Sequence, residues 1–383
     1  MKSECQITIC GDLCPTEDNK VYFESGDASG LFNGLLDIFL HSDFVIGNLE
    51  FPLINKGSKI NKIGPNFKGK SSYIGIFKSA NFKVLGMANN HIRDFGDKGI
   101  LNTIKVCQDA GISTVGAGEN RSIAKSPLIK NVKGWKIGIM AFAEHEFNAA
   151  TEVHAGANLF DIFYSYDDIL SVREQCDYLI VLYHGGVEYY QYPSPILQKK
   201  CKKMVDSGAD VVICQHSHCI GTIENYNEGT IIYGQGNTLF GYTEGDSEWN
   251  EGLLIKITLS KAPQQKSNFE FICISANTTG GTDVMPSDQA RLVLNNFFDR
   301  SKKIHEKGFL NESWIRFCNI YASRYLPSLL GFGRVISYIN RKLDNGFVRL
   351  VFSKQRLRQT MHFIRCEAHH EAIQTILEEF VGD

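Results

Sequence analysis

Polar side chains end five short apolar runs in this 383-residue sequence. The runs are QITICGD, DFVIGNLE, FKVLGMANNH, DYLIVLYHGG and DVVICQHSH. The polar residues at their ends are Asp12, Asn48, Glu50, Asn89, Asn90, His91, His184, His216 and His218. A lone histidine or aspartate in such a place is more often structural than a ligand. Five such ends in one chain favour a metal site, because carboxylate, amide and imidazole groups bind divalent metals.

The mixture of these side chains predicts transition metals and argues against calcium. Calcium takes oxygen ligands, whereas imidazole suits manganese, iron or zinc. A carboxylate that touches two ions holds them close together, and such a pair can clamp a phosphoryl oxygen and lower the pKa of a bridging water. We therefore expect two divalent transition metals, Mn, Fe or Zn. A nearby histidine would act as an acid or stabilise the leaving oxygen.

Strand-like and helix-like segments alternate over the first two-thirds of the chain and would position these residues. The apolar runs are rich in Val and Ile, which is typical of buried strands. Amphipathic stretches between them predict helices, for example LFNGLLDIFLHS, GDKGILNTIKVCQDAG and SPILQKKCKKMVDSGA. This alternation indicates an α/β fold with largely parallel strands, whose carboxyl ends form the usual ligand site. The later runs GTIIYGQGN, GLLIKITLS and FEFICISA predict a mainly antiparallel continuation.

The character of the chain changes near residue 280. NTTGGTDVMPSD is typical of a turn-rich linker, and the sequence after it is mostly helical. We predict one domain over residues 1–280 and a helical extension over residues 281–383. Residues 334–365 carry eight Arg or Lys against one acidic residue, Asp344. This basic segment could be a solvated helical face or an interfacial helix on an anionic membrane, and the lack of a recognised motif disfavours nucleic acid.

Composition and charge are those of an ordinary globular protein. A hydrophobic content of 43% allows a sizeable core, and the net charge of -2 favours no class of partner. Eleven cysteines without a CxxC pair imply neither a disulfide framework nor a zinc finger, and they suit a reducing compartment. We find no secretory signal and no run of about 18 apolar residues. We therefore expect a cytoplasmic protein, with any membrane contact peripheral.

Seven short motifs occur in the order seen in one known family. They are GD at 11–12, GNLE at 47–50, ANNHIRDFG at 88–96, GAGEN at 116–120, YHGGVEY at 183–189, HSH at 216–218 and GNTLF at 236–240. In this order the chain resembles CapA-type proteins of bacterial capsule or poly-γ-glutamate biosynthesis, within the calcineurin-like metallophosphoesterase superfamily. The resemblance covers about residues 5 to 275. It implies a four-layer αββα sandwich with mixed sheets and a dinuclear metal site at the sheet ends.

The resemblance also implies a ligand set. The first metal would be bound by Asp12 and His218, the second by Asn90, His184 and His216, and both by a bridging Glu50. General metallophosphoesterases have a histidine where this chain has Cys14. Either the first metal lacks a ligand there or the Cys14 thiolate replaces it, and a packed thiol is favoured because the CapA branch lacks a ligand at that place.

The motif ANNHIRDFG carries the predicted catalytic residues. His91 matches the catalytic histidine of the superfamily. Asp94, three residues later, is expected to orient the His91 ring through a hydrogen bond, as outer carboxylates do at metal sites. Asn89 is expected to satisfy the turn itself.

Four further residues are weaker candidates for substrate contacts, namely Lys68, Glu144, His145 and Glu188. Glu144 and His145 end another apolar run, and the alternative for both is a hydrogen-bonded loop. Lys68 lies where relatives often place a basic residue that could meet an anionic substrate, and its alternative is a solvated lysine. Glu188 follows the YHGG motif closely.

Together these observations favour a CapA-like metal-dependent hydrolase of the phosphoesterase type. Its partner would be an anionic polymer or a phosphoester substrate. Two alternatives stay open. One is a non-catalytic polymer-binding or scaffold component of a capsule-type assembly. The other is an amide hydrolase that acts on a γ-glutamyl polymer. The sequence predicts no oligomeric state.

Overall fold

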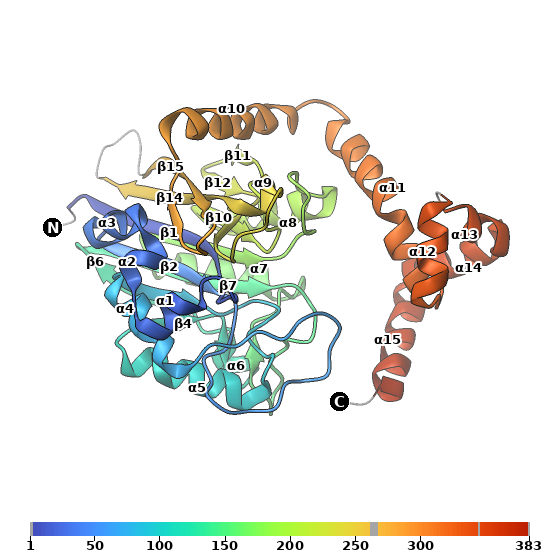
Figure 1. The fold of residues 1–383 in the computed structure, drawn as a ribbon, viewed down its shortest axis with the longest axis horizontal. Coiled ribbons are helices and arrows are strands. Elements are labelled where there is room, and N and C mark those ends of the chain that lie inside the picture. The colour runs from blue at the N-terminus through green and yellow to red at the C-terminus, as the bar shows by residue number, and fades with distance from the viewer. Residues whose placement is uncertain (1–2, 261–266, 344, 382–383) are drawn as a thin grey trace. The chain divides into compact units, whose positions relative to one another are not determined.

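Two mixed β-sheets form the centre of the molecule's first part (Figure 1). The computed structural model describes residues 3–260, 267–343 and 345–381, and it divides into two compact units, Met1–Leu310 and Asn311–Asp383. Both sheets belong to the first unit. In the described residues, the second unit is built from helices.

The larger sheet has the strand order β16-β15-β14-β1-β2-β3-β4, with β13 paired to β1. Its strands are β1 (Cys5–Leu13), β2 (Phe44–Leu49), β3 (Phe82–Gly86), β4 (Ser113–Val115), β13 (Asn237–Leu239), β14 (Glu251–Leu259), β15 (Ser267–Ala276) and β16 (Thr282–Val284). Strands β1 to β4 run parallel, whereas β14 to β16 extend the sheet in antiparallel pairs. The parallel part therefore directs several carboxyl ends to the same edge.

The smaller sheet has the strand order β11-β12-β10-β9-β7-β6. Its strands are β6 (Leu128–Val132), β7 (Trp135–Ala143), β9 (Tyr178–His184), β10 (Val211–Gln215), β11 (Ile223–Tyr226) and β12 (Gly229–Ile232). Strand β12 was expected in the mainly antiparallel continuation, but it pairs parallel to β10. Strands β5 (Ala117–Gly118) and β8 (Gly156–Ala157) form a separate two-stranded ribbon.

Alternate residues of the strands fill three apolar layers. Ile9 of β1 and Ile180 of β9 lie in the core between the two sheets. Leu13 faces the helices that cover the larger sheet, and Val181 faces those that cover the smaller one. The first group is α1 (Lys20–Ser25), α2 (Ala28–Phe32), α3 (Gly34–His41), α4 (Ile74–Ser79) and α5 (Gly96–Asp109), and the second is α7 (Ser165–Arg173) and α8 (Pro195–Asp206). The predicted α/β class and αββα sandwich are confirmed.

One predicted helix is broken. LFNGLLDIFLHS divides at Asn33 into the end of α2 and the whole of α3. Asn33 has a φ of 42°, and its side-chain amide donates to Gly30 O at 3.0 Å and Thr282 O at 3.3 Å. Asparagine tolerates this left-handed backbone because its side chain can hydrogen-bond locally. The short helices η1 (Ser71–Tyr73), α6 (Arg121–Ala124) and α9 (Ser247–Asn250) lie in connections.

The first unit extends beyond the boundary predicted at residue 280. Helix α10 (Ser287–Lys303) follows β16 and packs Val293 and Phe297 against Leu253 and Cys273 of the larger sheet. These apolar contacts bind α10 to the sheet, and so the unit continues to Leu310. The predicted boundary lies in the turn between β15 and β16.

The second unit contains the rest of α11 (Phe309–Leu329), followed by α12 (Arg334–Lys342), α13 (Gly346–Val351), α14 (Lys354–Arg365) and α15 (Glu367–Val381). The extension predicted as mostly helical over residues 281–383 contains strand β16 as well as these helices and α10. Within those residues, none of the helices combines the length and the apolar character needed to cross a bilayer.

Candidate metal centre

The predicted ligands converge where β1, β2, β9 and β10 end. Two groups of buried side chains bring their ligand atoms within 4.8 Å of one another. One group is Glu50, His184 and His216, and the other is Asp12, Glu50 and His218. Glu50 belongs to both groups, which is the geometry expected of a carboxylate between two ions.

Unusual backbone conformations present the two histidines of the HSH motif. His216 has a φ of 88° and His218 a φ of 52°, in a region that non-glycine residues rarely adopt. Gly11 supports the same edge of the sheet, because a Cβ there would lie 2.2 Å from Gly236 O. Backbone strain such as that at His216 and His218 persists only where surrounding contacts over-determine it, and it is concentrated at functional sites.

Glu50 is fully buried, and neither of its carboxylate oxygens has a hydrogen-bond partner in the described structure. Burial raises the pKa of Glu50 well above its ordinary range, and the nearby Asp12 carboxylate raises it further. The imidazole Nδ1 of His216 is likewise buried without a partner. Buried polar atoms are normally satisfied, so these orphaned atoms fit a site that binds cations.

Asp12 is held in place from two sides. Its Oδ1 accepts a hydrogen bond from Asn48 Nδ2 at 2.7 Å, and its Oδ2 accepts one from the His216 backbone N–H at 3.1 Å. His218 Nδ1 lies 3.5 Å from Asp12 Oδ2 and 2.9 Å from Asn237 Oδ1. The Asn237 amide oxygen thus contacts the His218 ring from outside the ligand groups and helps to orient it.

The remaining ligands adjoin one another. His184 Nε2 lies 3.0 Å from Asn90 Oδ1 and 3.6 Å from Glu50 Oε1. Burial lowers the pKa of His184 well below its usual value, and it lowers that of His216 to about 3. Both rings are therefore neutral at physiological pH, which is the state in which imidazole binds metals.

His91 stands beside this ligand set. Its Nδ1 lies 2.8 Å from Asp94 Oδ2, the contact expected from the sequence. Asp94 is fully buried and also accepts a hydrogen bond from the Phe67 backbone N–H at 2.6 Å. Asn89 donates to Leu49 O at 2.8 Å and accepts from the His91 N–H, so it holds the turn.

Residues 6–242 match the family model described as bacterial capsule synthesis protein PGA_cap. The chain belongs to this family. It is 31% identical over 244 residues to the capsule biosynthesis protein CapA of Bacillus anthracis, covering 61% of this chain and 59% of that protein. It is 28% identical over 285 residues to the PGA biosynthesis protein CapA of Bacillus subtilis, covering 73% and 70%. The match to the first relative thus spans less than two-thirds of its length.

Among solved structures, a novel phosphatase from Mycoplasma pneumoniae aligns with a TM-score of 0.45 at 13% identity, over 72% of this chain and 95% of that one. A 5'-nucleotidase from Candida albicans aligns with a TM-score of 0.40 at 10% identity, over 73% and 53% of the two chains.

Two charged residues near the centre of this PGA_cap protein were missed in the sequence. The Lys62 side chain is only 2% exposed, and its Nζ lies 2.5 Å from Asp94 Oδ1. Glu146 is exposed, yet desolvation by the surrounding protein raises its pKa, while the charge of Lys62 and a hydrogen bond with Asn90 oppose the rise. Lys62 lies in a polar loop, INKGSKINKIGP, that carries no strand-end signal. Glu146 lies two residues after Glu144, where the sequence alone singled out Glu144 and His145.

The weaker candidates have other partners. Glu144 accepts hydrogen bonds from Tyr183 OH at 2.9 Å and from the Gly186 N–H at 3.2 Å, and exposed His145 lies 3.2 Å from the carbonyl oxygen of residue 160. These contacts are those of a hydrogen-bonded loop. Lys68 is exposed, with its Nζ 5.1 Å from the Phe95 ring centroid.

Glu188 and Cys14 differ in their relation to the ligand groups. Glu188 is half-buried, and its charge contributes to the raised pKa of Glu50, which places it within electrostatic reach of the centre. Cys14 is buried in the apolar core between the larger sheet and its helices, and it belongs to neither ligand group. Burial raises the pKa of its thiol well above normal, as in a packed cysteine.

Aromatic rings contact two histidines of the centre, His91 and His218. The Phe67 ring lies 4.4 Å from the His91 ring, and the Phe240 and Trp249 rings lie 4.8 and 4.9 Å from that of His218. These three aromatic side chains therefore pack against histidines of the candidate site. They occur at separate places in the sequence, and so no local pattern indicates them.

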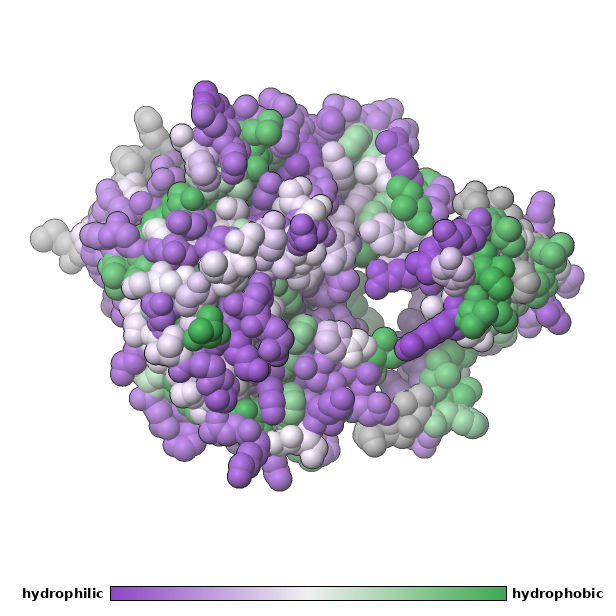
Figure 2. Space-filling view, viewed as in Figure 1, coloured by the Kyte–Doolittle hydropathy of each residue, from purple (hydrophilic) through white to green (hydrophobic). Residues whose placement is uncertain are grey.

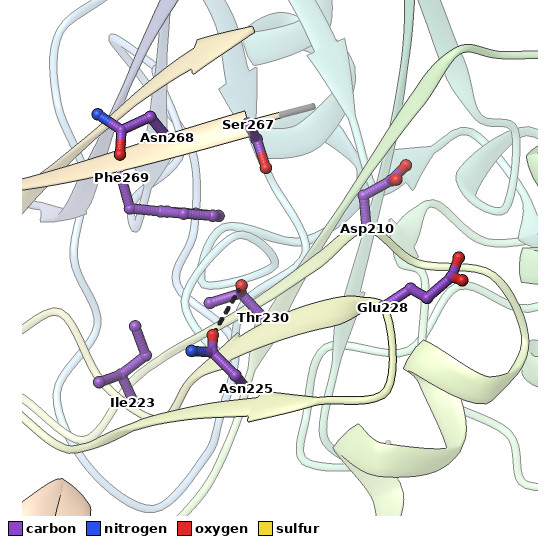
Figure 3. Close-up of a pocket in the computed structure, with 8 residues that line it drawn as sticks. All are labelled: Asp210, Ile223, Asn225, Glu228, Thr230, Ser267, Asn268 and Phe269. Carbon is purple, nitrogen blue, oxygen red and sulfur yellow. Dashed lines mark hydrogen bonds between the residues drawn. The ribbon is translucent and has the colours of Figure 1, made fainter. Parts of the chain in front are cut away.

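A separate hollow of about 370 Å³ lies at the other end of the smaller sheet (Figure 3). Asp210, which lines it, directly precedes β10, whereas His216 directly follows that strand. Asp210 accepts a hydrogen bond from the Leu179 N–H at 2.7 Å and pairs with Arg173. Its carboxylate is thus engaged within the fold, and the hollow carries no ligand cluster among the described residues.

Proposed function

We propose that this PGA_cap protein is a metal-dependent hydrolase of the phosphoesterase type that acts in capsule or poly-γ-glutamate biosynthesis. One observation carries the proposal. Glu50 is a buried carboxylate, shared by two ligand groups, whose oxygens lack hydrogen-bond partners in the described structure. A purely structural carboxylate in that place would be paired, because an unpaired buried charge is strongly unfavourable.

Two divalent transition metals would be held at this site, with Mn, Fe or Zn as the candidates. The residues that would hold them are Asp12, Glu50, Asn90, His184, His216 and His218. When bound, such ions supply Lewis acidity and make a nearby water more acidic. The protein itself would hold the ligand side chains in place and keep other hydrogen-bond partners away from their ligand atoms.

His91 would act on the leaving group. Because its Nδ1 is directed to Asp94 at 2.8 Å, its Nε2 is the nitrogen left to face a substrate. From that position it would stabilise or protonate the leaving oxygen. Asp94 would act through His91 by holding the ring, and it would not itself touch the substrate.

The relatives support an anionic substrate. Two of them are named as capsule and PGA biosynthesis proteins, and the substrate proposed here is an anionic polymer or a phosphoester on its route. The same names favour one second candidate, the hydrolysis of a γ-glutamyl amide. A metal centre polarises an amide carbonyl as it does a phosphoryl oxygen.

Metal analysis and a substrate panel test the proposal. We expect purified protein to contain about two equivalents of metal, to hydrolyse a phosphodiester such as bis-p-nitrophenyl phosphate, and to lose turnover in His91→Ala. The matched control is His41→Ala, because His41 is an exposed histidine that contacts Asp37 of its own helix. Hydrolysis of a γ-glutamyl peptide alone would select the second candidate. Metal-free protein that stays inactive with added Mn, Fe or Zn would favour the polymer-binding scaffold.

We also propose a reducing compartment, such as the cytoplasm, as the place of action. All eleven cysteines are free, and most are buried. Cys201 and Cys214 lie with their sulfurs 3.6 Å apart and remain unbridged. The protein would be unfolded and alkylated directly after cell lysis, and its intact mass would then be measured. We expect eleven modified thiols. A disulfide-linked form would contradict the proposed reducing compartment.

A further inference from the structure

A buried lysine lies behind His91. Lys62 belongs to the connection between β2 and η1, yet its side chain is only 2% exposed. Its Nζ lies 2.5 Å from Asp94 Oδ1, 3.4 Å from the carbonyl oxygen of Asn90 and 3.2 Å from His91 Nδ1. Lysine is rarely buried unless it is paired, so this placement needs the Asp94 carboxylate.

The two oxygens of Asp94 have different partners. Oδ1 faces Lys62, while Oδ2 faces His91 Nδ1 at 2.8 Å and accepts the Phe67 N–H at 2.6 Å. The Asp94 carbonyl oxygen accepts the Ile60 N–H at 3.0 Å. One residue therefore anchors the loop that carries Lys62 and Phe67 and also holds the imidazole.

Two tautomers of His91 compete in this arrangement. A proton on Nδ1 would be donated to Asp94, whereas a lone pair on Nδ1 could accept from Lys62 at 3.2 Å. The carboxylate oxygen is nearer, and a lone pair facing it would be repelled. With its ammonium bound to Oδ1, Lys62 keeps Oδ2 directed at the ring. This arrangement favours the tautomer with the proton on Nδ1.

Resting on the proposed function, we propose that Lys62 is a positioning residue that fixes Asp94 and thereby the orientation and tautomer of His91. Lys62 does not reach the substrate, because its side chain is enclosed. Its removal should lower kcat by about 10–100-fold, the usual effect of an outer partner at a metal site. KM should change little, since the substrate contacts remain.

The test compares Lys62→Met, Lys62→Arg and the matched control Lys59→Met, which alters an exposed lysine of the same loop. We expect Lys62→Met to lower kcat at constant KM and metal content, Lys62→Arg to restore part of it, and Lys59→Met to match wild type. Long-range ¹H–¹⁵N spectra of labelled histidines, assigned with His91→Gln, should show an Nδ1–H tautomer in wild type and its loss in Lys62→Met.

Unchanged kcat and an unchanged tautomer in Lys62→Met would overturn the proposal. If Lys62→Met does not fold, Lys62→Gln, which keeps one donor, takes its place in both measurements. Wild-type protein that binds metal but hydrolyses nothing would defeat the proposed function alone. The spectra would then decide about Lys62, because the tautomer is read without turnover.

A second inference comes from the helices of the second unit. Their described side chains include only two large buried apolar ones, Phe317 and Val348. Many others are exposed, including Ile315, Ile320, Leu329, Val335, Ile339, Leu350, Ile364, Leu377 and Phe380. Figure 2 shows hydrophobic residues gathered on the surface of these helices. Apolar surface of this extent marks a face that a partner covers.

Helix α12 shows most clearly that a polar side chain is buried while apolar side chains are exposed. Its Asn340 is fully buried, with Nδ2 donating to Asn345 Oδ1 and Oδ1 accepting the Val348 N–H, both at 3.0 Å. Val335 and Ile339, four residues apart on one face, are 74% and 43% exposed. The helix thus turns its polar side toward α13 and its apolar side outward.

Basic residues border the apolar face. Arg334, Arg341 and Lys342 of α12 are exposed, and the last two lie 5.9 and 5.8 Å from the Tyr338 ring centroid. On α14 the exposed basic residues are Lys354, Arg356, Arg358 and Arg365. Exposed apolar side chains flanked by Lys and Arg are the pattern of a helix that lies in the interface of an anionic membrane.

We infer that the apolar face of α12 docks onto an anionic lipid surface. Val335, Ile336 and Ile339 would lie in the acyl boundary, and the exposed basic residues of α12 and α14 would lie against the headgroups. Charge favours lipid over a second copy as the occupant. Of the residues 334–365, eight are basic and one is acidic, and two such faces would repel each other.

Co-sedimentation of the full chain with vesicles tests this inference. Vesicles of phosphatidylcholine with about 30% phosphatidylglycerol should bind the protein at least about tenfold more strongly than pure phosphatidylcholine, and added salt should weaken the binding. Arg341→Glu/Lys342→Glu and Ile336→Ser/Ile339→Ser should each lower binding by about tenfold or more. The matched control is Lys199→Glu/Lys203→Glu, an equal charge change at two exposed residues of α8.

Three results would overturn it. One is equal or absent binding to both kinds of vesicle. Another is undiminished binding by the Arg341→Glu/Lys342→Glu variant. The third is a dimer of wild-type protein, seen by sedimentation without lipid and dissolved by the α12 substitutions, which would assign the face to a second copy. Unchanged helical content by circular dichroism would show that the variants remain folded.

Discussion

The two units of the chain place polar and apolar side chains in opposite ways. In the first unit, apolar residues such as Ile213 are buried between two sheets, and unpaired polar atoms are concentrated around Glu50. In the second unit, α12 buries Asn340 and exposes Ile339. Each unit thus carries one feature that the described residues leave unmatched. For the first we propose a cationic partner, and for the second an anionic lipid surface.

The largest effect is expected at the metal centre. Glu50→Gln removes the charge shared by both ligand groups. Because metal stabilisation of a transition state amounts to several kcal/mol, turnover should fall about a thousandfold or more. Vesicle binding should be unchanged. Loss of vesicle binding in Glu50→Gln would show that the two units do not act separately.

A pair of substitutions tests the contrast in packing. Ile213→Ala opens a cavity between the sheets and should lower the free energy of unfolding by about 2–4 kcal/mol. Ile339→Ala removes a half-exposed side chain and should change it by about 0.5 kcal/mol or less. Chemical denaturation followed by tryptophan fluorescence measures both. A similar loss in Ile339→Ala would mean that the α12 face is packed within the protein.

The strand ends were predictable because their signals are local. A run such as DVVICQHSH shows both a buried strand and the polar residues after it, and His216 and His218 indeed reach the ligand groups. The burial of Lys62 was not predictable. It depends on a loop that folds back onto Asp94, 32 residues later in the chain, and nothing in the loop's composition indicates this.

Two other features could not be predicted from the sequence, for the same physical reason. Glu144 follows a strand as the members of the ligand groups do, but its carboxylate meets Tyr183 and Gly186 outside those groups. The direction taken after a strand depends on neighbouring strands, which the local sequence does not contain. The amphipathic pattern of α12 likewise fits both a buried and an interfacial helix, because the pattern marks an apolar side without saying what covers it.

A smaller effect is expected from Asn237, which pairs with the ring of His218 at 2.9 Å and donates to Trp249 O at 2.9 Å. Asn237→Ala should weaken metal binding by about 10–100-fold, because the His218 ring loses its orienting partner. Titration calorimetry with Mn or Zn measures the change. Asn225→Ala, at the hollow beyond the other end of the sheet, is the matched control. Equal affinities of the two variants would mean that Asn237 does not orient His218.

The smallest expected effect is the release of a proton when metal binds. Burial raises the pKa of Glu50 well above normal, so the metal-free protein holds Glu50 protonated at pH values where a free carboxyl is ionised. The pKa of His184 is lowered well below normal, and that ring binds without losing a charge. A metal favours the carboxylate, and so binding below the Glu50 pKa should release a proton and tighten as the pH rises. Calorimetry in buffers of different ionisation enthalpy measures that proton. If none is released, Glu50 is already ionised in the metal-free protein, and its unpaired oxygens must be stabilised by a partner other than a proton.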